Sequence, residues 1–299
     1  MGRAVIGILA LMLSSSAVAQ TPYRYEADVI DINQGVYVCD RADTSTLNKL
    51  AEPWREHETI LLLHGNAESG DAYYGWMPEL TRNYRVVRPD MRGFGRTTPM
   101  PRDHAWSLDR IVDDFIAVMD HLKIDRFYLV GAKVGGTMAM HLAARHPSRV
   151  KTVSVLSSPT RGEDAGERYR AWVQLIEKSG VEGWARETMG KRLGSSFSAA
   201  GIEWWIRLMG KTASSTQLGF IGSVPKVDVT QDLPKIRCPA QVITTQNNPM
   251  YPVEVIRTWQ QKIPNSELLV LPADGYHVAA TAPVACARAV LDFIARNKS

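Results

Sequence analysis

The composition of this chain contains little that would define a function by itself. The 299 residues include only three cysteines, and Lys and Arg number 35 against 31 Asp and Glu. So slight and scattered a positive excess does not favour a nucleic-acid-binding protein. Cys39, Cys238 and Cys286 have no metal-site spacing and allow at most one internal disulfide. We therefore expect no metal and no organic cofactor, and cysteines that act mainly as small buried hydrophobic residues.

Apolar runs of membrane-spanning length are also absent, and the one notable run lies at the N-terminus. Arg3 precedes the apolar stretch Ala4–Leu13, and Ala17-Val18-Ala19 stands before Gln20. This is the pattern of a cleaved secretory signal peptide over residues 1–19. The alternative, an N-terminal membrane anchor, is disfavoured because the run is short for a bilayer. We expect an exported protein, periplasmic or secreted, with no stable membrane insertion after cleavage.

The 45% apolar content suffices for the large core of a single α/β domain. Residues 26–38 alternate in polarity around Asn33-Gln34-Gly35 and predict an antiparallel hairpin. Thr59–Leu63 is continuously apolar, as is typical of a central parallel strand. Further strands are expected at 85–88, 127–130, 153–156, 241–245 and 268–271, and helices at 71–81, 107–122, 137–145, 251–263 and 284–296. This alternation predicts a mostly parallel, doubly wound sheet.

The strand pattern stops between residues 161 and 233. Amphipathic stretches near 171–178, 184–189 and 202–211 predict helices there. The segment also contains four of the eight tryptophans, Trp172, Trp184, Trp204 and Trp205. We interpret 161–233 as a helical cap inserted into a core formed by 20–160 and 234–299. Most of its tryptophans are expected to pack inside the cap rather than to contact a ligand.

The most informative stretch is Leu129-Val130-Gly131-Ala132-Lys133-Val134-Gly135-Gly136. A strand runs into a glycine-bracketed corner and a helix follows, which is the layout of a nucleophile elbow. The glycines allow a tight turn against close neighbours. The residue that such a turn lifts above the sheet is here Lys133, not Ser, Cys or Asp.

Landmarks around this corner resemble those of the α/β-hydrolase family, in the same order along roughly residues 25–297. His64-Gly65-Asn66 after the first central strand is similar to the family's oxyanion-hole loop. The segment 88–97 resembles the loop after the next strand. Asp274-Gly275-Tyr276-His277 is placed like the segment of the family's catalytic histidine. The usual acid position holds Asn248, so His277 alone remains of the triad.

The resemblance implies an α/β-hydrolase fold with a cap that roofs the site and sets substrate choice. It assigns Lys133, His277 and Asn248 to the catalytic positions, with Asn66, Val134 and Gly65 as oxyanion or substrate-binding residues. Asn248 would orient the ring of His277 by a hydrogen bond. Some relatives place the acid after another strand, which makes Glu163 or Asp164 candidates for a displaced acid.

A lysine in this corner is expected to be a nucleophile. The helix N-terminus and burial both disfavour the ammonium form, so the pKa of Lys133 is expected below the ordinary value of about 10.4. A neutral amine can attack an aldehyde or ketone and form an imine, an electron sink for C–C cleavage. We therefore predict an enzyme acting on a small carbonyl compound, of the C–C lyase or hydrolase type, with His277 as acid/base.

Two alternatives stay open. His277 could activate water against an ester or lactone while Lys133 stabilises the oxyanion. The chain could instead be a non-catalytic binder in which charged Lys133 anchors a carboxylate or phosphate. Either way, the partner is a small carbonyl or carboxylate compound.

The remaining polar residues favour structural roles. Asp90 and Arg92 are expected to brace the loop after their strand, and His64 to support its own loop. The other histidines are expected on helix faces or at the surface: His104, His121, His141 and His146. Tyr251 and Tyr276 flank the predicted site.

Overall fold

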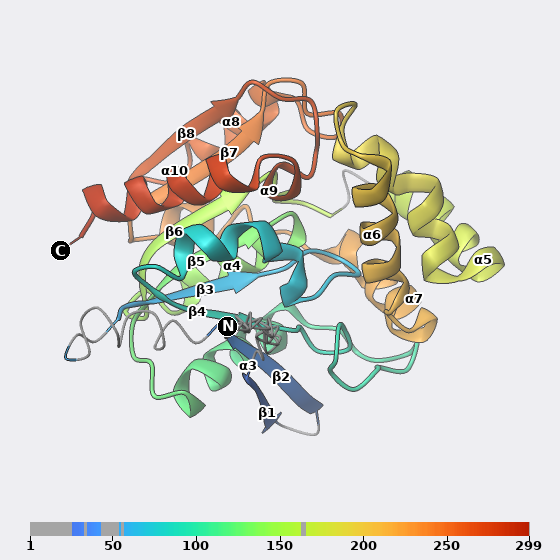
Figure 1. The fold of residues 1–299 in the computed structure, drawn as a ribbon, viewed down its shortest axis with the longest axis horizontal. Coiled ribbons are helices and arrows are strands. Elements are labelled where there is room, and N and C mark those ends of the chain that lie inside the picture. The colour runs from blue at the N-terminus through green and yellow to red at the C-terminus, as the bar shows by residue number, and fades with distance from the viewer. Residues whose placement is uncertain (1–25, 33–34, 43–53, 55–56, 163–165, 299) are drawn as a thin grey trace, which may run out of the picture.

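The computed structural model describes residues 26–32, 35–42, 54, 57–162 and 166–298 (Figure 1). The predicted signal peptide at 1–19 and the candidate acids Glu163 and Asp164 lie outside the described residues. Within the described part of the chain, no helix is long and apolar enough to cross a membrane.

The centre of the fold is an eight-stranded sheet in the order β1-β2-β4-β3-β5-β6-β7-β8. From β4 to β8 all neighbours are parallel, whereas β1 pairs with β2, and β2 with β4, in antiparallel fashion. The predicted N-terminal hairpin is confirmed. The strands are β1 (Glu26–Ile32), β2 (Gly35–Ala42), β3 (Thr59–Leu63), β4 (Arg85–Pro89), β5 (Phe127–Ala132), β6 (Val150–Leu156), β7 (Ala240–Thr245) and β8 (Ser266–Leu271).

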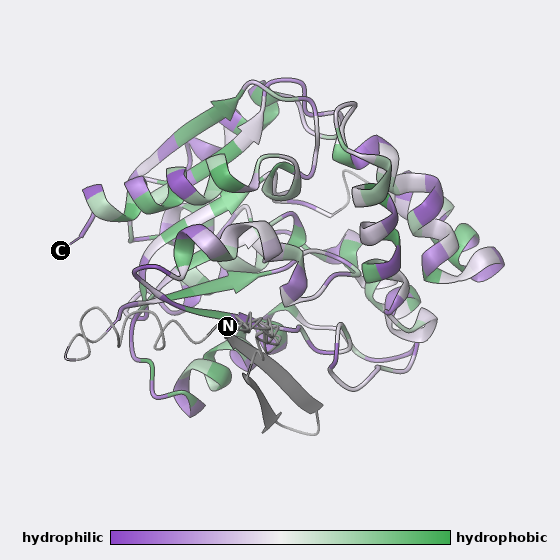
Figure 2. Cartoon of the chain, viewed as in Figure 1, coloured by the Kyte–Doolittle hydropathy of each residue, from purple (hydrophilic) through white to green (hydrophobic). Residues whose placement is uncertain are grey.

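Helices cover both faces of the sheet, and the predicted doubly wound architecture is confirmed. One apolar cluster joins the sheet to α3 (Leu108–His121), α4 (Val134–Arg145) and α8 (Val253–Gln260). A second cluster, on the other face, joins it to η1 (Gly70–Trp76), α2 (Met77–Leu80), α9 (Val278–Thr281) and α10 (Pro283–Arg296). Figure 2 shows the matching pattern, with apolar central strands and α10 striped in hydrophilic and hydrophobic residues.

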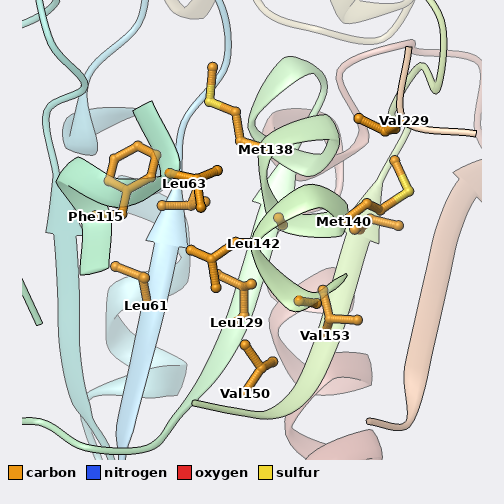
Figure 3. Close-up of a cluster of buried hydrophobic side chains, with 14 of the residues drawn as sticks. Leu61, Leu63, Phe115, Leu129, Met138, Met140, Leu142, Val150, Val153 and Val229 are labelled. Carbon is orange, nitrogen blue, oxygen red and sulfur yellow. The ribbon is translucent and has the colours of Figure 1, made fainter. Parts of the chain in front are cut away.

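The first cluster shows why these strands and helices associate. Leu61 and Leu129 on neighbouring strands meet Phe115 of α3 and Leu142 of α4 (Figure 3). These side chains are almost fully buried. Each such side chain contributes about 1.5–3 kcal/mol through loss of its contact with water. This packing fixes the sheet under the corner that begins α4.

One predicted helix begins as expected, and another differs in detail from the prediction. Ser107 caps α3 as expected, its hydroxyl accepting a hydrogen bond from the Arg110 N–H. The helix expected at 71–81 is instead the 3₁₀ helix η1 followed by the short α2. Tyr73 departs from helical geometry inside η1, and Pro78 lies at the start of α2, where a missing N–H costs nothing. The periodicity of polar and apolar residues does not distinguish one continuous α-helix from a 3₁₀ helix followed by a short α-helix.

Between β6 and β7 the chain forms α5 (Gly166–Leu193), α6 (Ala199–Gly210) and α7 (Ser214–Ser223), followed by the one-turn 3₁₀ helices η3 (Val224–Lys226) and η4 (Leu233–Lys235). Helices α5 to α7, hereafter the cap, gather at one end of the sheet (Figure 1). They share an apolar cluster with Ala67 and Ala280 of the core. Trp184 and Trp205 are fully buried in it, as predicted for packing residues. Cys238 and Cys286 are buried free thiols.

Candidate active site at the β5–α4 corner

Lys133 occupies the corner between β5 and α4 in the strained geometry of an elbow. Its φ and ψ are 57° and −125°, a conformation that residues with a Cβ adopt at an energetic cost. The Lys133 N–H donates to the Leu156 carbonyl over 2.8 Å, which ties the corner to β6. Gly135 follows without a side chain because a Cβ there would collide with the Leu63 carbonyl. The predicted elbow is therefore present, with an amine at its tip.

The loop after β3 lies directly against the lysine side chain. At Gly65, a Cβ would collide with Cε of Lys133 and with Glu68 Oε2, so the lack of a side chain allows this close approach. The Gly65 N–H donates to Glu68 Oε2 over 2.9 Å. His64 accepts from the Met91 N–H at Nε2, 2.9 Å, and its Nδ1 lies 2.8 Å from the Gly65 carbonyl. His64 thus supports the loop, as predicted, and burial lowers its pKa.

Glu68 brings the site together, and sequence reasoning missed it. Its Oε1 forms an ion pair with Nζ of Lys133 and lies 3.0 Å from Nε2 of His277. The residues Lys133, Glu68 and His277 are only 5%, 2% and 2% exposed, so their contacts are screened from water. The sequence feature that could have indicated Glu68 is its position, two residues after the His64-Gly65-Asn66 loop and therefore close to the predicted oxyanion hole.

The electrostatics of this cluster favour neutral bases. Burial, reinforced by the charge of Arg192, holds the pKa of Lys133 well below its ordinary value. Burial together with the charges of Lys133 and Arg192 does the same to the pKa of His277. The Glu68 carboxylate acts in the opposite direction by favouring protonated partners. An amine, an imidazole and a carboxylate in direct contact can therefore exchange a proton without solvent.

Asn248 does not have the predicted role of orienting His277. Its amide oxygen accepts from the Met250 and Tyr251 N–H groups, at 2.9 and 3.1 Å. Its amide nitrogen donates to Thr244 Oγ1 over 3.2 Å and lies 3.4 Å from Ser157 Oγ. The Asn248 side chain is occupied with its own turn, and within the part of the chain that the structure describes His277 Nδ1 is buried without a partner. The acid in contact with His277 is Glu68, on the opposite nitrogen.

The other predicted polar residues are mostly structural. Asp90 accepts from the Gly70 and Arg96 N–H groups, at 2.8 and 2.9 Å, and so braces its loop as expected. Arg92 forms a buried pair with Asp114, 2.9 Å at both nitrogens. His141 lies on a face of helix α4, as expected, and its ring is held between two acids. Its ring nitrogens lie 2.7 Å from Asp232 and 2.7 Å from Asp109, which joins α4 to α3 and η4.

A small cavity of about 40 Å³ opens at the amine, lined by residues of both core and cap. Asn66 and Val134, two of the predicted oxyanion residues, line it together with Lys133. The Val134 N–H is at the first helical position, where helix geometry provides no intrahelical acceptor. The N–H of Gly65, the third residue predicted for oxyanion or substrate binding, donates to Glu68 Oε2. The cavity is also lined by Pro159, Tyr169, Trp172, Arg192, Phe220, Val224, Met250, Tyr251 and Tyr276.

The cap closes the site from above. The ring centroids of Trp205 and His277 are 4.5 Å apart. The His277 N–H donates to the Arg192 carbonyl over 3.0 Å, which ties the histidine to the end of α5. A larger groove of about 890 Å³ lies on the other side of Val134 and Phe220, between α3, α4 and the cap, and does not reach Lys133. The chemistry is therefore expected in the small enclosed cavity.

Comparison with known proteins agrees with this architecture. Residues 58–280 match the family model described as alpha/beta hydrolase fold. The chain is 26% identical over 248 residues to "Putative carbamate hydrolase RutD" of Caulobacter sp. (strain K31), covering 81% of this chain and 92% of that protein. It is 38% identical over 102 residues to 2-hydroxymuconate semialdehyde hydrolase of Pseudomonas sp. (strain CF600), covering 33% of this chain and 36% of that protein. The enol-lactonase from Burkholderia xenovorans LB400 superposes with a TM-score of 0.78 at 19% identity, over 90% of this chain and 100% of that one.

Proposed function

Because the chain belongs to the α/β-hydrolase fold family, we propose that it is an enzyme of this family that cleaves a C–C bond in a small carbonyl compound through the amine of Lys133. The observation that supports this most directly is the contact of Lys133, Glu68 and His277 in one buried cluster. Hydroxyl chemistry is not required, because the elbow presents an amine whose pKa is lowered by burial. A neutral amine is a competent nucleophile toward aldehydes and ketones.

The first steps follow from the contacts. The Lys133 amine adds to the carbonyl carbon, and the oxygen takes a proton from the Glu68–His277 pair to form a carbinolamine. Loss of water then gives the protonated imine. Donors at Asn66 and Val134, which line the same cavity, stabilise the oxygen while it carries charge. The small volume of the cavity limits entry of competing water.

Bond cleavage uses the protonated imine as an electron sink. When the adjacent C–C bond of a β-hydroxycarbonyl substrate breaks, its electron pair forms an enamine, and the hydroxyl proton passes to Glu68 or His277. Glu68 or His277 then returns this proton to the enamine carbon. Water hydrolyses the resulting imine, which releases the product and the free amine. The related Pseudomonas sp. (strain CF600) protein, whose name gives a semialdehyde as its substrate, supports a carbonyl compound as the substrate class.

Borohydride trapping tests this proposal. The protein is incubated with small aldehydes, ketones and oxo acids, reduced, and mapped by peptide mass. We expect a stable adduct on Lys133, absent in Lys133→Met and in Lys133→Arg, with product formation lost in both. Exposed Lys211 in the same digest is the internal control for non-specific labelling. Labelling of Lys211 and similar surface lysines alone would refute the imine.

One observation favours a second candidate function. The ion pair with Glu68 favours the ammonium form of Lys133, which suits an electrostatic rather than a nucleophilic role. In that case the Glu68–His277 pair removes a proton from water, the hydroxide attacks an ester or lactone, and Lys133 stabilises the oxyanion. An enol-lactonase and an esterase from Thermogutta terrifontis share the fold. Ester or lactone turnover that survives Lys133→Arg but not His277→Gln would select this candidate.

A non-catalytic binder remains the third interpretation of Lys133. It predicts saturable binding of an organic anion with no product over long incubation. Turnover of any panel substrate that depends on Lys133 or His277 would exclude it.

A further inference from the structure

A second buried cation lies beside the amine and has no acidic partner in the described part of the chain. Arg192, in the last turn of α5, is 7% exposed. Its Nη2 donates to Thr188 Oγ1 over 2.9 Å and lies 3.6 Å from Met209 Sδ. Its guanidinium carbon lies 4.9 Å from the ring centre of Trp184 and 5.7 Å from that of Trp172. These contacts position the guanidinium, yet none neutralises it.

Burying a charge without a counter-charge is costly, so a fold rarely retains one without a reason. Burial lowers the pKa of Arg192 to about 10, which leaves it charged at neutral pH. Its Nε is buried and has no hydrogen-bond partner among the described residues. The residue lines the same cavity as Lys133. The charged group that carries this unsatisfied donor therefore belongs to a residue that lines the candidate active site.

We propose that Arg192 is the binding site for a carboxylate of the substrate, which makes the substrate a small oxo acid. The planar guanidinium matches the geometry of a carboxylate and binds it through paired N–H donors. Lys133 and Arg192 share a cavity of about 40 Å³. The carbonyl carbon and the carboxylate of a bound molecule are therefore separated by few bonds. This deepens the proposed function, since it rests on the carbonyl being presented to Lys133.

The anion subsite can be tested without any turnover. Trp172 and Trp184 pack on the guanidinium, so binding beside it should alter tryptophan fluorescence. We expect propionate to give a saturable change and uncharged, isosteric propionamide to give none. Arg192→Met should weaken propionate binding roughly tenfold or more, and Arg192→Lys less, as charged hydrogen bonds require. The matched control is Arg207→Met on the exposed side of the cap, where binding should be unchanged.

Lys133→Met separates this proposal from the proposed function. Propionate has no carbonyl that can form an imine, so its binding should survive this substitution even if borohydride trapping fails altogether. If propionate and propionamide behave alike in the wild-type protein, the subsite is refuted. Binding that is lost with Lys133→Met but kept with Arg192→Met would also overturn it, since Lys133 would then be the anchor.

Thermal unfolding without ligand distinguishes an arginine that binds a ligand from one that only stabilises the fold. Removal of an uncompensated buried charge predicts that Arg192→Met has an unfolding midpoint equal to or above that of the wild type. Propionate should raise the wild-type midpoint and leave that of Arg192→Met unchanged. A midpoint of Arg192→Met clearly below that of the wild type would identify a structural residue and overturn the proposal.

Discussion

At the scale of single residues, the site depends on which of three buried groups holds a proton. Glu68 accepts from the Gly65 N–H at Oε2 and contacts Lys133 and His277 at Oε1. A carboxylate with so many donors is stabilised in its charged form. It can therefore stabilise a proton held by the base on either side of it, Lys133 or His277. This role belongs to Glu68 and not to Asn248, whose side chain is occupied by its own turn.

The first prediction concerns a substitution that removes the negative charge of Glu68. Glu68→Gln keeps the shape of the side chain but eliminates its charge, so turnover should fall by roughly 10²–10⁴-fold, the typical range for acid–base catalysis. The pKa of Lys133 should fall further, because the carboxylate that favours the ammonium is gone. Borohydride trapping of Lys133 should consequently extend to lower pH while turnover is lost.

Glu58→Gln is the matched control for this change. Glu58 is partly exposed and pairs with Lys151 over 2.5 Å, far from the elbow along β3. Its substitution should leave both turnover and the pH profile of trapping unchanged. Unaltered turnover in Glu68→Gln would show that the buried carboxylate has no part in the chemistry.

A second prediction concerns the pH dependence of stability. The pKa of His277 is lowered in the folded protein by burial and by the charges of Lys133 and Arg192. Between that lowered pKa and the unfolded value of about 6.5, the unfolded chain binds a proton that the folded chain does not. Stability should therefore decrease as pH falls below about 6.5, by up to about 1.4 kcal/mol per pH unit.

Urea unfolding from pH 7.5 to 5 checks this. His277→Gln should lose less stability over that range than the wild type, because it removes the group that resists protonation. Exposed His121→Gln serves as the control and should follow the wild type. Parallel pH curves for the wild type and His277→Gln would contradict the prediction.

At the scale of elements, the parts governed by local pattern were predictable and those governed by long-range contact were not. The strand Thr59–Leu63, the Ser107 cap and the elbow at Lys133 follow from apolar runs, a capping residue and glycine spacing. The partner of His277 does not, because Glu68 is 209 residues away and reaches it only through the folding of the β3 loop. The helix break at Gly180, with φ of 71°, instead follows the local pattern, because it falls between the amphipathic stretches predicted at 171–178 and 184–189.

The approach of the β3 loop to the elbow gives the third prediction. A Cβ at Gly65 would collide with the Lys133 side chain, so Gly65→Ala should destabilise the wild type by about 1–3 kcal/mol, the usual cost of overpacking. In a Lys133→Ala background this cost should fall, because the nearest colliding atom, on Lys133, is gone and only Glu68 Oε2 remains close. Denaturant unfolding of the four proteins in this double-mutant cycle measures the coupling.

Gly135→Ala provides the contrasting case. There the added Cβ would meet the backbone carbonyl of Leu63, which Lys133→Ala does not remove. Its cost should be the same in both backgrounds. If the changes in the free energy of unfolding caused by Gly65→Ala and Lys133→Ala are additive, the β3 loop and the Lys133 side chain are not in repulsive contact.

At the scale of the whole molecule, the site is assembled from two layers. The core provides Lys133, Glu68 and His277, while the cap provides Arg192 and Trp205. Neither layer alone encloses the cavity. At about 40 Å³ it accommodates only a few water-sized groups, so a ligand of several carbons requires the cap to move. Separation of cap and core should then control entry and release.

The last prediction tests this motion through an aromatic contact at the outer edge of the two layers. Trp204 of α6 is 39% exposed, and its ring centre lies 4.7 Å from that of Tyr74 in η1. An aromatic pair contributes about 0.5–1.5 kcal/mol beyond its buried area. Trp204→Ala should weaken the closed state by about that amount, and stopped-flow fluorescence should show propionate associating severalfold faster. Val255→Ala, which truncates an exposed apolar residue on α8 away from the cap, should leave the rate unchanged. An association rate that is equal in Trp204→Ala and the wild type would mean that ligands reach Arg192 without separation of the cap from the core.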